Sequence, residues 1–156
     1  MYIRALLFIA IIVGVPTAAE PGQPSITNLP RLRARAAQMC SYMKKRDFAA
    51  AYDLASPDAR SCLTREAWVN EWKSSGDGKM VTCTIKKVES AVTETKDVKS
   101  KCSDARLMPK DAAVVKVKFE LRFPDGTNDV VDDWYNGWIY VDDDWYWHDW
   151  ASPSMD

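Results

Sequence analysis

Few residues of this chain combine types and positions that could do acid–base chemistry. His148 is the single histidine and precedes Asp149, a combination that could act as an acid/base pair. Neighbouring side chains of a strand point to opposite faces, so we expect His148 to be exposed or at a rim instead. An isomerase-type site could also use Asp53, Asp133 or the phenol of Tyr52, but we expect solvated carboxylates and a core tyrosine. No catalytic residue is therefore assigned.

The chain contains four cysteines, Cys40, Cys62, Cys83 and Cys102. In an exported chain an even number favours two disulfides over free thiols. Three connectivities are possible and the sequence cannot select one. Our preferred hypothesis pairs Cys40 with Cys62 and Cys83 with Cys102, because this would staple the helical half and the sheet half separately. A zinc site is the alternative, and the lack of a Cys-x-x-Cys pair and the single histidine disfavour it.

Three consecutive aspartates, Asp142, Asp143 and Asp144, form the most acidic stretch of the chain. Calcium prefers several oxygen ligands in a flexible loop, but a dedicated calcium loop places its carboxylates at alternate positions. Aspartate is also a good turn residue. We therefore expect an acidic turn, and no metal or cofactor.

Aromatic side chains are the most unusual feature of the chain. Alternation along residues 134–141 puts one set (Trp134, Trp138, Tyr140) on one face and another (Tyr135, Ile139, Val141) on the opposite face. One face must build the core, and the other would be an exposed patch of the kind that contacts proteins or glycans, unless something covers it. The candidate ligand-binding or partner-binding residues are Tyr52, Trp68, Trp72, Trp134, Trp138, Tyr140, Trp145 and Trp147.

Helical periodicity precedes these aromatic segments. Apolar residues recur at helical spacing from Leu29 to Met43. Asp47, Ser56 and Thr64 are good N-cap residues, which predicts a short helix after Asp47, a brief turn after Ser56 and a helix over 65–73.

Strand patterns follow the helices. Residues 80–93, 113–123, 130–141 and 145–150 read as strands, and the polar stretch 96–110 between the first two reads as a long loop. Helices followed by a run of antiparallel strands predict an α+β fold, with the N-terminal helices packed on a curved antiparallel sheet.

The N-terminus has the pattern of a signal peptide. Arg4 precedes an apolar run from Ala5 to Val15, and small residues lead to a cleavage site after Ala19. The apolar run is far short of the ~20 residues that span a bilayer, so we expect no stable membrane insertion after cleavage. We predict a signal peptide (1–19), an exposed lead-in (20–30), one domain (31–151) and a tail (152–156), in a periplasmic or secreted protein.

Charge is distributed unevenly along the chain. All nine acidic residues after Phe123 are aspartates, and no lysine or arginine accompanies them. We expect these charges to pair with the basic strands of the same fold, with an acidic surface for a cation or basic partner as the alternative. Nucleic-acid binding is not expected, because the aromatic end is the anionic end.

Three motifs resemble those of one known superfamily. They are the stretch from Asp47 to Pro57, the stretch from Leu63 to Trp68, and the aromatic hairpin from Trp138 to Trp147. Together they resemble exported bacterial members of the nuclear transport factor 2-like (cystatin-like) superfamily. This resemblance implies a cone of helices in a bent sheet, with a pocket at its open end that serves enzymes in some members and binding modules in others.

Two functions follow from these expectations. The first is an exported, non-catalytic binding or accessory module that contacts a protein or a small ligand through its pocket or its aromatic hairpin, and that could form a homodimer. The alternative is a small pocket enzyme of the isomerase, dehydratase or hydrolase type. A pocket that converges on a buried carboxylate or on His148 would favour the enzyme.

Overall fold

The computed structural model describes residues 26–90, 98–103, 106–107 and 109–148. The predicted signal peptide, the predicted tail and Trp150 lie outside these residues. The helices are α1 (Leu29–Lys45), α2 (Phe48–Tyr52), α3 (Pro57–Cys62) and α4 (Arg65–Ser74). The strands are β1 (Lys79–Ser90), β2 (Val98–Lys99), β3 (Arg106–Leu107), β4 (Asp111–Arg122), β5 (Asn128–Val141) and β6 (Asp144–Trp147).

The helix boundaries follow the capping residues that the sequence indicates. The side chains of Asp47, Ser56 and Thr64 each accept a hydrogen bond from a backbone N–H three residues later, at the start of α2, α3 and α4. Helix α1 ends at Arg46, whose φ of 55° places it in the left-handed region. The three predicted N-caps are confirmed.

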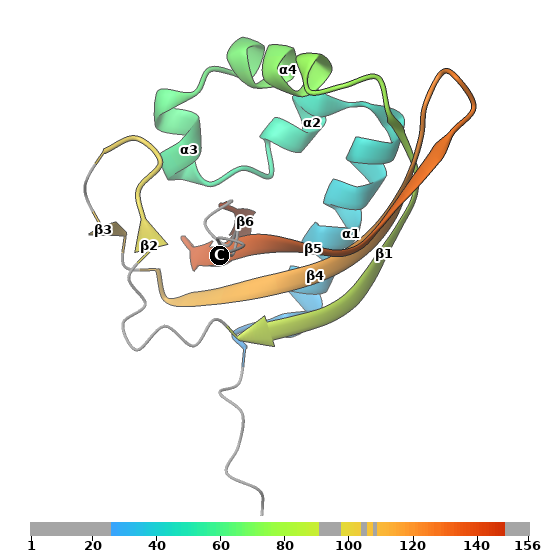
Figure 1. The fold of residues 1–156 in the computed structure, drawn as a ribbon. Coiled ribbons are helices and arrows are strands. Elements are labelled where there is room, and N and C mark those ends of the chain that lie inside the picture. Colours follow the sequence, from blue (N-terminus) through green and yellow to red (C-terminus); the bar gives the residue numbers. More distant parts are fainter. Residues whose placement is uncertain (1–25, 91–97, 104–105, 108, 149–156) are drawn as a thin grey trace, which may run out of the picture.

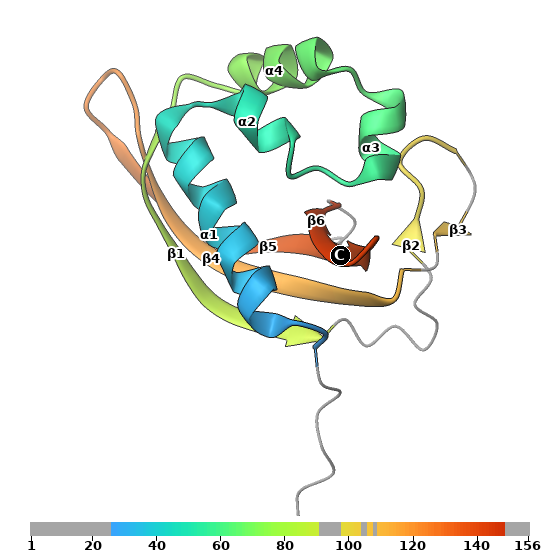
Figure 2. The ribbon, with the colours of Figure 1, turned by 180° about the vertical axis from the view of Figure 1, so that it is seen from behind.

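Four strands form one antiparallel sheet in the order β1-β4-β5-β6, and β2 and β3 form a separate pair. The long strands curl around α1, which lies across their concave side, while α2, α3 and α4 arch over the same side (Figures 1 and 2). The predicted α+β class is confirmed. The curled sheet with its helices also agrees with the fold that the sequence resemblance implies.

Alternation along β4 decides which side chains face the helices. Val115, Val117 and Phe119 are buried in the main core, together with residues of α1, α2, α4, β5 and β6. A second, smaller cluster on the other face joins Ala112 and Ile139 with Leu107, Val141 and Tyr146. The short strand β3 therefore covers part of the face on which the sequence predicts an aromatic patch.

The disulfides differ from the preferred pairing. Cys40 of α1 bonds to Cys83 of β1, and Cys62 of α3 bonds to Cys102 in the segment after β2. The predicted pairing of sequence neighbours is therefore wrong. The curl of the sheet brings β1 against α1, so each bridge joins the helical layer to a segment that follows it by about forty residues.

Charges of the acidic C-terminal part pair with the basic part, as predicted. The ion pairs of this kind in the described residues are Lys116–Asp133, Lys118–Asp132, Lys110–Asp143 and those of Asp144 with Arg31 and Arg35. Among the described residues no group of three or more His, Cys, Asp or Glu side chains could hold a metal ion. None of the described helices is long and apolar enough to span a membrane.

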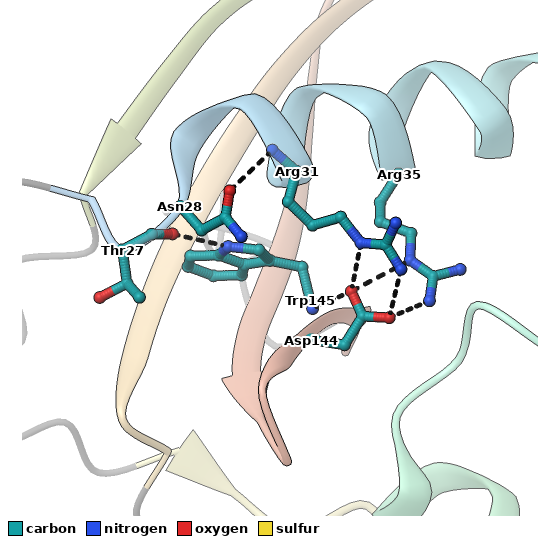
Figure 3. A network of polar contacts seen from close by, with 6 residues as sticks. All are labelled: Thr27, Asn28, Arg31, Arg35, Asp144 and Trp145. Atoms are coloured by element: carbon teal, nitrogen blue, oxygen red, sulfur yellow. Dashed lines mark hydrogen bonds and ion pairs between the residues drawn. The ribbon is translucent and has the colours of Figure 1, made fainter.

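Asp144 is the most strongly held of these carboxylates (Figure 3). It accepts two hydrogen bonds from Arg31, at 2.9 and 3.0 Å, further ones from Arg35, and one from the backbone N–H of Trp145 at 2.8 Å. The bond from Arg31 and then that from Arg35 hold the pKa of Asp144 far below its ordinary value. This carboxylate ties the β5–β6 turn to α1.

Candidate functional site

A cavity of about 380 Å³ lies between α1, the segment that joins α4 to β1, and the concave face of the sheet. Its walls are mostly apolar, and their largest contributions come from β4, β5 and the C-terminal half of α1. The size falls in the range of about 300 to 1,000 Å³ that small-molecule sites occupy. It is the strongest candidate for a functional site in the described part of the chain.

The outer end of the cavity is defined by exposed lining residues. Ser75 and Gly76 are exposed, and the side chain of Trp134, also in the lining, is 44% exposed. Trp134 packs edge-on against Phe119, with ring centroids 5.7 Å apart, and its Nε1 donates to Asn136 Oδ1 at 2.7 Å. The indole is therefore held in place at the opening.

The inner end of the cavity is formed by indoles that solvent does not reach. Trp138 is 1% exposed and Trp147 is 8% exposed. Trp147 packs between Trp72 of the cavity lining, 6.0 Å away, and Trp68 behind it, 5.0 Å away. Alternation along β5 and β6 points these rings into the concave side, so the inner wall is rigid and aromatic.

Two of these inner indoles carry unsatisfied hydrogen-bond donors. The Nε1 atoms of Trp138 and Trp147 are buried and have no partner among the described residues, and the same holds for Trp68, which is not part of the lining. By contrast, Nε1 of the fully buried Trp145 donates to the carbonyl oxygen of Thr27 at 2.8 Å. Leaving a buried donor unpaired costs about 1 to 3 kcal/mol. These Nε1 atoms are buried within the wall, so the contact that the inner end offers a ligand is that of the aromatic rings.

Arg46 is the only charged residue of the lining. Its Nη1 donates to the carbonyl oxygen of Gly78 at 3.3 Å, and its guanidinium lies 5.5 Å from the centre of the Phe48 ring. It forms no ion pair with a carboxylate of the described residues. The bond to Gly78 holds this cation near the outer end of the cavity, where it can bind an anionic group.

The disulfide between Cys40 and Cys83 is part of the cavity wall. It joins α1 to the edge strand β1 and so fixes the position of these two neighbouring elements of the wall. The second bridge, at Cys62, is exposed and lies outside the lining.

The candidate catalytic residues from the sequence lie elsewhere. Asp53 pairs with Arg65 at the surface, and Asp133 pairs with Lys116, whose Nζ lies 2.7 Å from its carboxylate. Tyr52 is half-buried and donates its O–H to the carbonyl oxygen of Leu63 at 2.7 Å. None of the three lines the cavity, and the lining contains no Asp, Glu or His.

His148 is not the exposed or rim residue that strand alternation predicts. It is 1% exposed, and its Nδ1 lies 2.7 Å from the hydroxyl of Ser56, which is also fully buried. Ser56 is held there because its backbone N–H donates to the carbonyl oxygen of Trp147 at 2.9 Å, and its hydroxyl also accepts from Ala59 N at 3.1 Å. The pair joins α3 to the end of β6, outside the cavity.

The eight predicted binding residues separate into two groups. Trp72, Trp134, Trp138 and Trp147 line the cavity, whereas Tyr52, Trp68, Tyr140 and Trp145 do not. The sequence did not indicate that Arg46, the disulfide and the apolar residues of α1 belong to the cavity. Alternation along residues 113–123 could have indicated that Phe119, Leu121 and Phe123 share the inner face of a strand. Nothing in the sequence indicates that Arg46, the residue after α1, lines the cavity.

No family model matches the chain, and no curated protein matches it. Among solved structures, one similar chain comes from Exiguobacterium sibiricum 255-15 and is provisionally described as a Ca/calmodulin-dependent kinase II association domain. It is 12% identical, with a TM-score of 0.48 over 81% of this chain and 92% of that one. A second, from Xanthomonas campestris and described in the same way, is 16% identical, with a TM-score of 0.49 over 83% and 89% of the two chains. What the site can bind therefore follows from this chain's own residues.

Proposed function

We propose that this chain is an exported, non-catalytic module that holds a small ligand in the apolar cavity. The observation that carries the proposal is a cavity of about 380 Å³ whose lining, among the residues that the structure describes, is mostly aromatic and aliphatic and contains no Asp, Glu or His. General acid–base catalysis needs a titratable group within hydrogen-bond reach of the substrate. A cavity lined in this way can select a ligand by shape and apolar contact.

The disulfides fit an exported protein. Each of the two bridges joins a helix to a distant segment of the chain, and disulfides persist in oxidising compartments. The signal-peptide pattern of residues 1–19 supports export to the periplasm or the outside.

The described surface favours a small ligand over a protein partner. The exposed large hydrophobic residues of the described part are Val130, 49% exposed, and Trp134. Protein interfaces depend on a central cluster of aromatic anchors, and most of the predicted aromatic candidates are buried in the core or in the cavity wall. The homodimer stays a prediction, and sedimentation velocity tests it by measuring the oligomeric state of the mature protein.

A neutral apolar fluorophore tests the proposal directly. Phenylnaphthylamine, which fluoresces strongly only in apolar surroundings, is titrated into the disulfide-intact mature protein. We expect saturable binding with one site per chain. Leu121→Trp adds bulk to the cavity wall and should weaken binding at least tenfold, by the steric cost of overfilling the site.

Glu120→Trp is the matched control. It adds the same side chain one residue earlier on β4, where alternation points it to the opposite face. The control should bind the fluorophore as the unmodified protein does. If both variants bind equally well, or if the unmodified protein shows no saturable binding, the proposed function is wrong.

A further inference from the structure

The inner and outer ends of the cavity make different chemical demands on a ligand. At the inner end, Trp138 and Trp147 form an aromatic wall, and their Nε1 atoms are buried within that wall. The inner end therefore offers apolar contact and suits a hydrocarbon group.

The outer end presents a positive charge. The Arg46 guanidinium lies near the opening because Nη1 is bonded to the carbonyl oxygen of Gly78, and both residues line the cavity. Gly78 in turn lies against Phe123, since a Cβ at this position would be 3.0 Å from a Phe123 ring carbon. With no described carboxylate paired to it, the guanidinium attracts an anion, and its planar donors suit a carboxylate.

The two ends are separated by an apolar middle. On β5, Trp134 is near the opening and pairs with Val117 of β4. Trp138 lies four residues further along β5, at the inner end, and pairs with Ala113. Side chains from α1 and β4 line the stretch between them, among them Met39 and Phe119. A ligand that meets both ends must be elongated and apolar in its middle.

We infer that the ligand is an apolar acid: its carboxylate binds Arg46 at the opening, and its apolar body fills the cavity as far as the aromatic inner wall. This inference rests on the proposed function and names the chemical class of its ligand.

Displacement of phenylnaphthylamine tests the carboxylate. Decanoate and decanol have the same apolar chain and differ in the charged group. At low ionic strength decanoate should displace the fluorophore at a concentration roughly tenfold lower than decanol, because a charge-assisted hydrogen bond to Arg46 stabilises it. Arg46→Gln should remove this preference.

Arg33→Gln is the matched control for the charge. Arg33 is an exposed residue of α1 that does not line the cavity, so its loss changes the net charge equally and should keep the preference. Equal displacement by decanoate and decanol in the unmodified protein would overturn the inference. So would an equal effect of the two arginine variants.

Each result of these experiments separates the inference from the proposed function. Binding of phenylnaphthylamine and decanol without preference for decanoate would contradict the acid and leave the small-ligand function standing. Absence of binding by all probes would contradict the proposed function itself.

Discussion

Cys40 and Cys83 are joined in the wall of the cavity, with their Cα atoms 5.7 Å apart, so that one disulfide links α1 to the edge strand β1. The sheet curls around α1 (Figure 1), and this bridge ties α1 to the strand at the edge of the sheet. The bridge therefore has two roles: it stabilises the fold and it shapes the site. The two roles can be measured separately.

Replacing both residues of this bridge, as Cys40→Ala with Cys83→Ala, should lower the free energy of unfolding by about 3 to 4 kcal/mol, because the unfolded chain regains the entropy of an open loop. Removing the other bridge, as Cys62→Ala with Cys102→Ala, is the matched control, since its sequence separation is 40 residues against 43. Urea denaturation should give similar losses for both. Phenylnaphthylamine affinity should fall only in the first variant, and an equal fall in both would contradict the role in the cavity wall.

The same pairing can be checked without any substitution. Proteolysis of the unreduced mature protein, followed by mass spectrometry, should yield linked peptides that contain Cys40 with Cys83 and Cys62 with Cys102. A linked peptide that joins Cys40 to Cys62 would contradict the observed arrangement. Addition of a reductant before digestion should release all four cysteine peptides.

Local sequence signals predicted the elements well, because the physics that decides them is local. Asp47, Ser56 and Thr64 each need only the next three residues to cap a helix, and all three do so. The alternation along β4 separates its inner and outer faces in the same local way.

Contacts between distant segments could not be predicted in this way. His148 contacts Ser56, 92 residues earlier, because backbone hydrogen bonds of Trp147 with Leu54 and with Ser56 bring that segment to the end of β6. The partner of Cys40 depends on how far the sheet curls, which no spacing along the chain encodes. Arg46 reaches the cavity because α1 ends there in a left-handed turn, a conformation that an arginine rarely adopts.

Removing the carboxylate of Asp144 should destabilise the protein and make its free energy of unfolding depend less on pH in acid. The pKa of Asp144 is lowered in the folded state, so its contribution is present above the unfolded pKa of about 4 and is lost as the pH falls toward the lower folded pKa. Asp144→Asn should therefore lose about 1 to 2 kcal/mol at pH 7, with a smaller difference from the unmodified protein at pH 2. Denaturation with urea at a series of pH values measures both.

Asp143→Asn is the control for this prediction. Its side chain is 81% exposed and pairs with the exposed Lys110, so solvent screens the pair and the loss should be much smaller. If the two variants lost stability equally and with the same dependence on pH, the contact of Asp144 with α1 would not be the cause.

Replacing Ser56 should cost more than the loss of a helix cap alone. Ser56→Ala removes the side-chain acceptor of Ala59 N at the start of α3 and also leaves the buried Nδ1 of His148 without its hydroxyl partner. We expect a loss of about 2 to 4 kcal/mol, the sum of one N-cap and one buried hydrogen bond. Thr64→Ala, which removes only the exposed cap of α4, should cost about 1 kcal/mol. Thermal unfolding of both variants compares the two, and equal losses would show that the bond to His148 contributes nothing.

The segment before α1 should contribute measurably to stability. The carbonyl oxygen of Thr27 accepts from the buried indole of Trp145, the backbone N–H of Thr27 donates to Asp111 at 2.6 Å, and Asn28 caps α1 (Figure 3). A chain that begins at Leu29 loses all three interactions, whereas one that begins at Ser25 keeps them. We expect the shorter chain to unfold at a lower urea concentration, with a loss of about 2 kcal/mol or more, because the donor of Trp145 is left unpaired in the core. Equal midpoints for the two chains would show that this segment is a lead-in without a structural role.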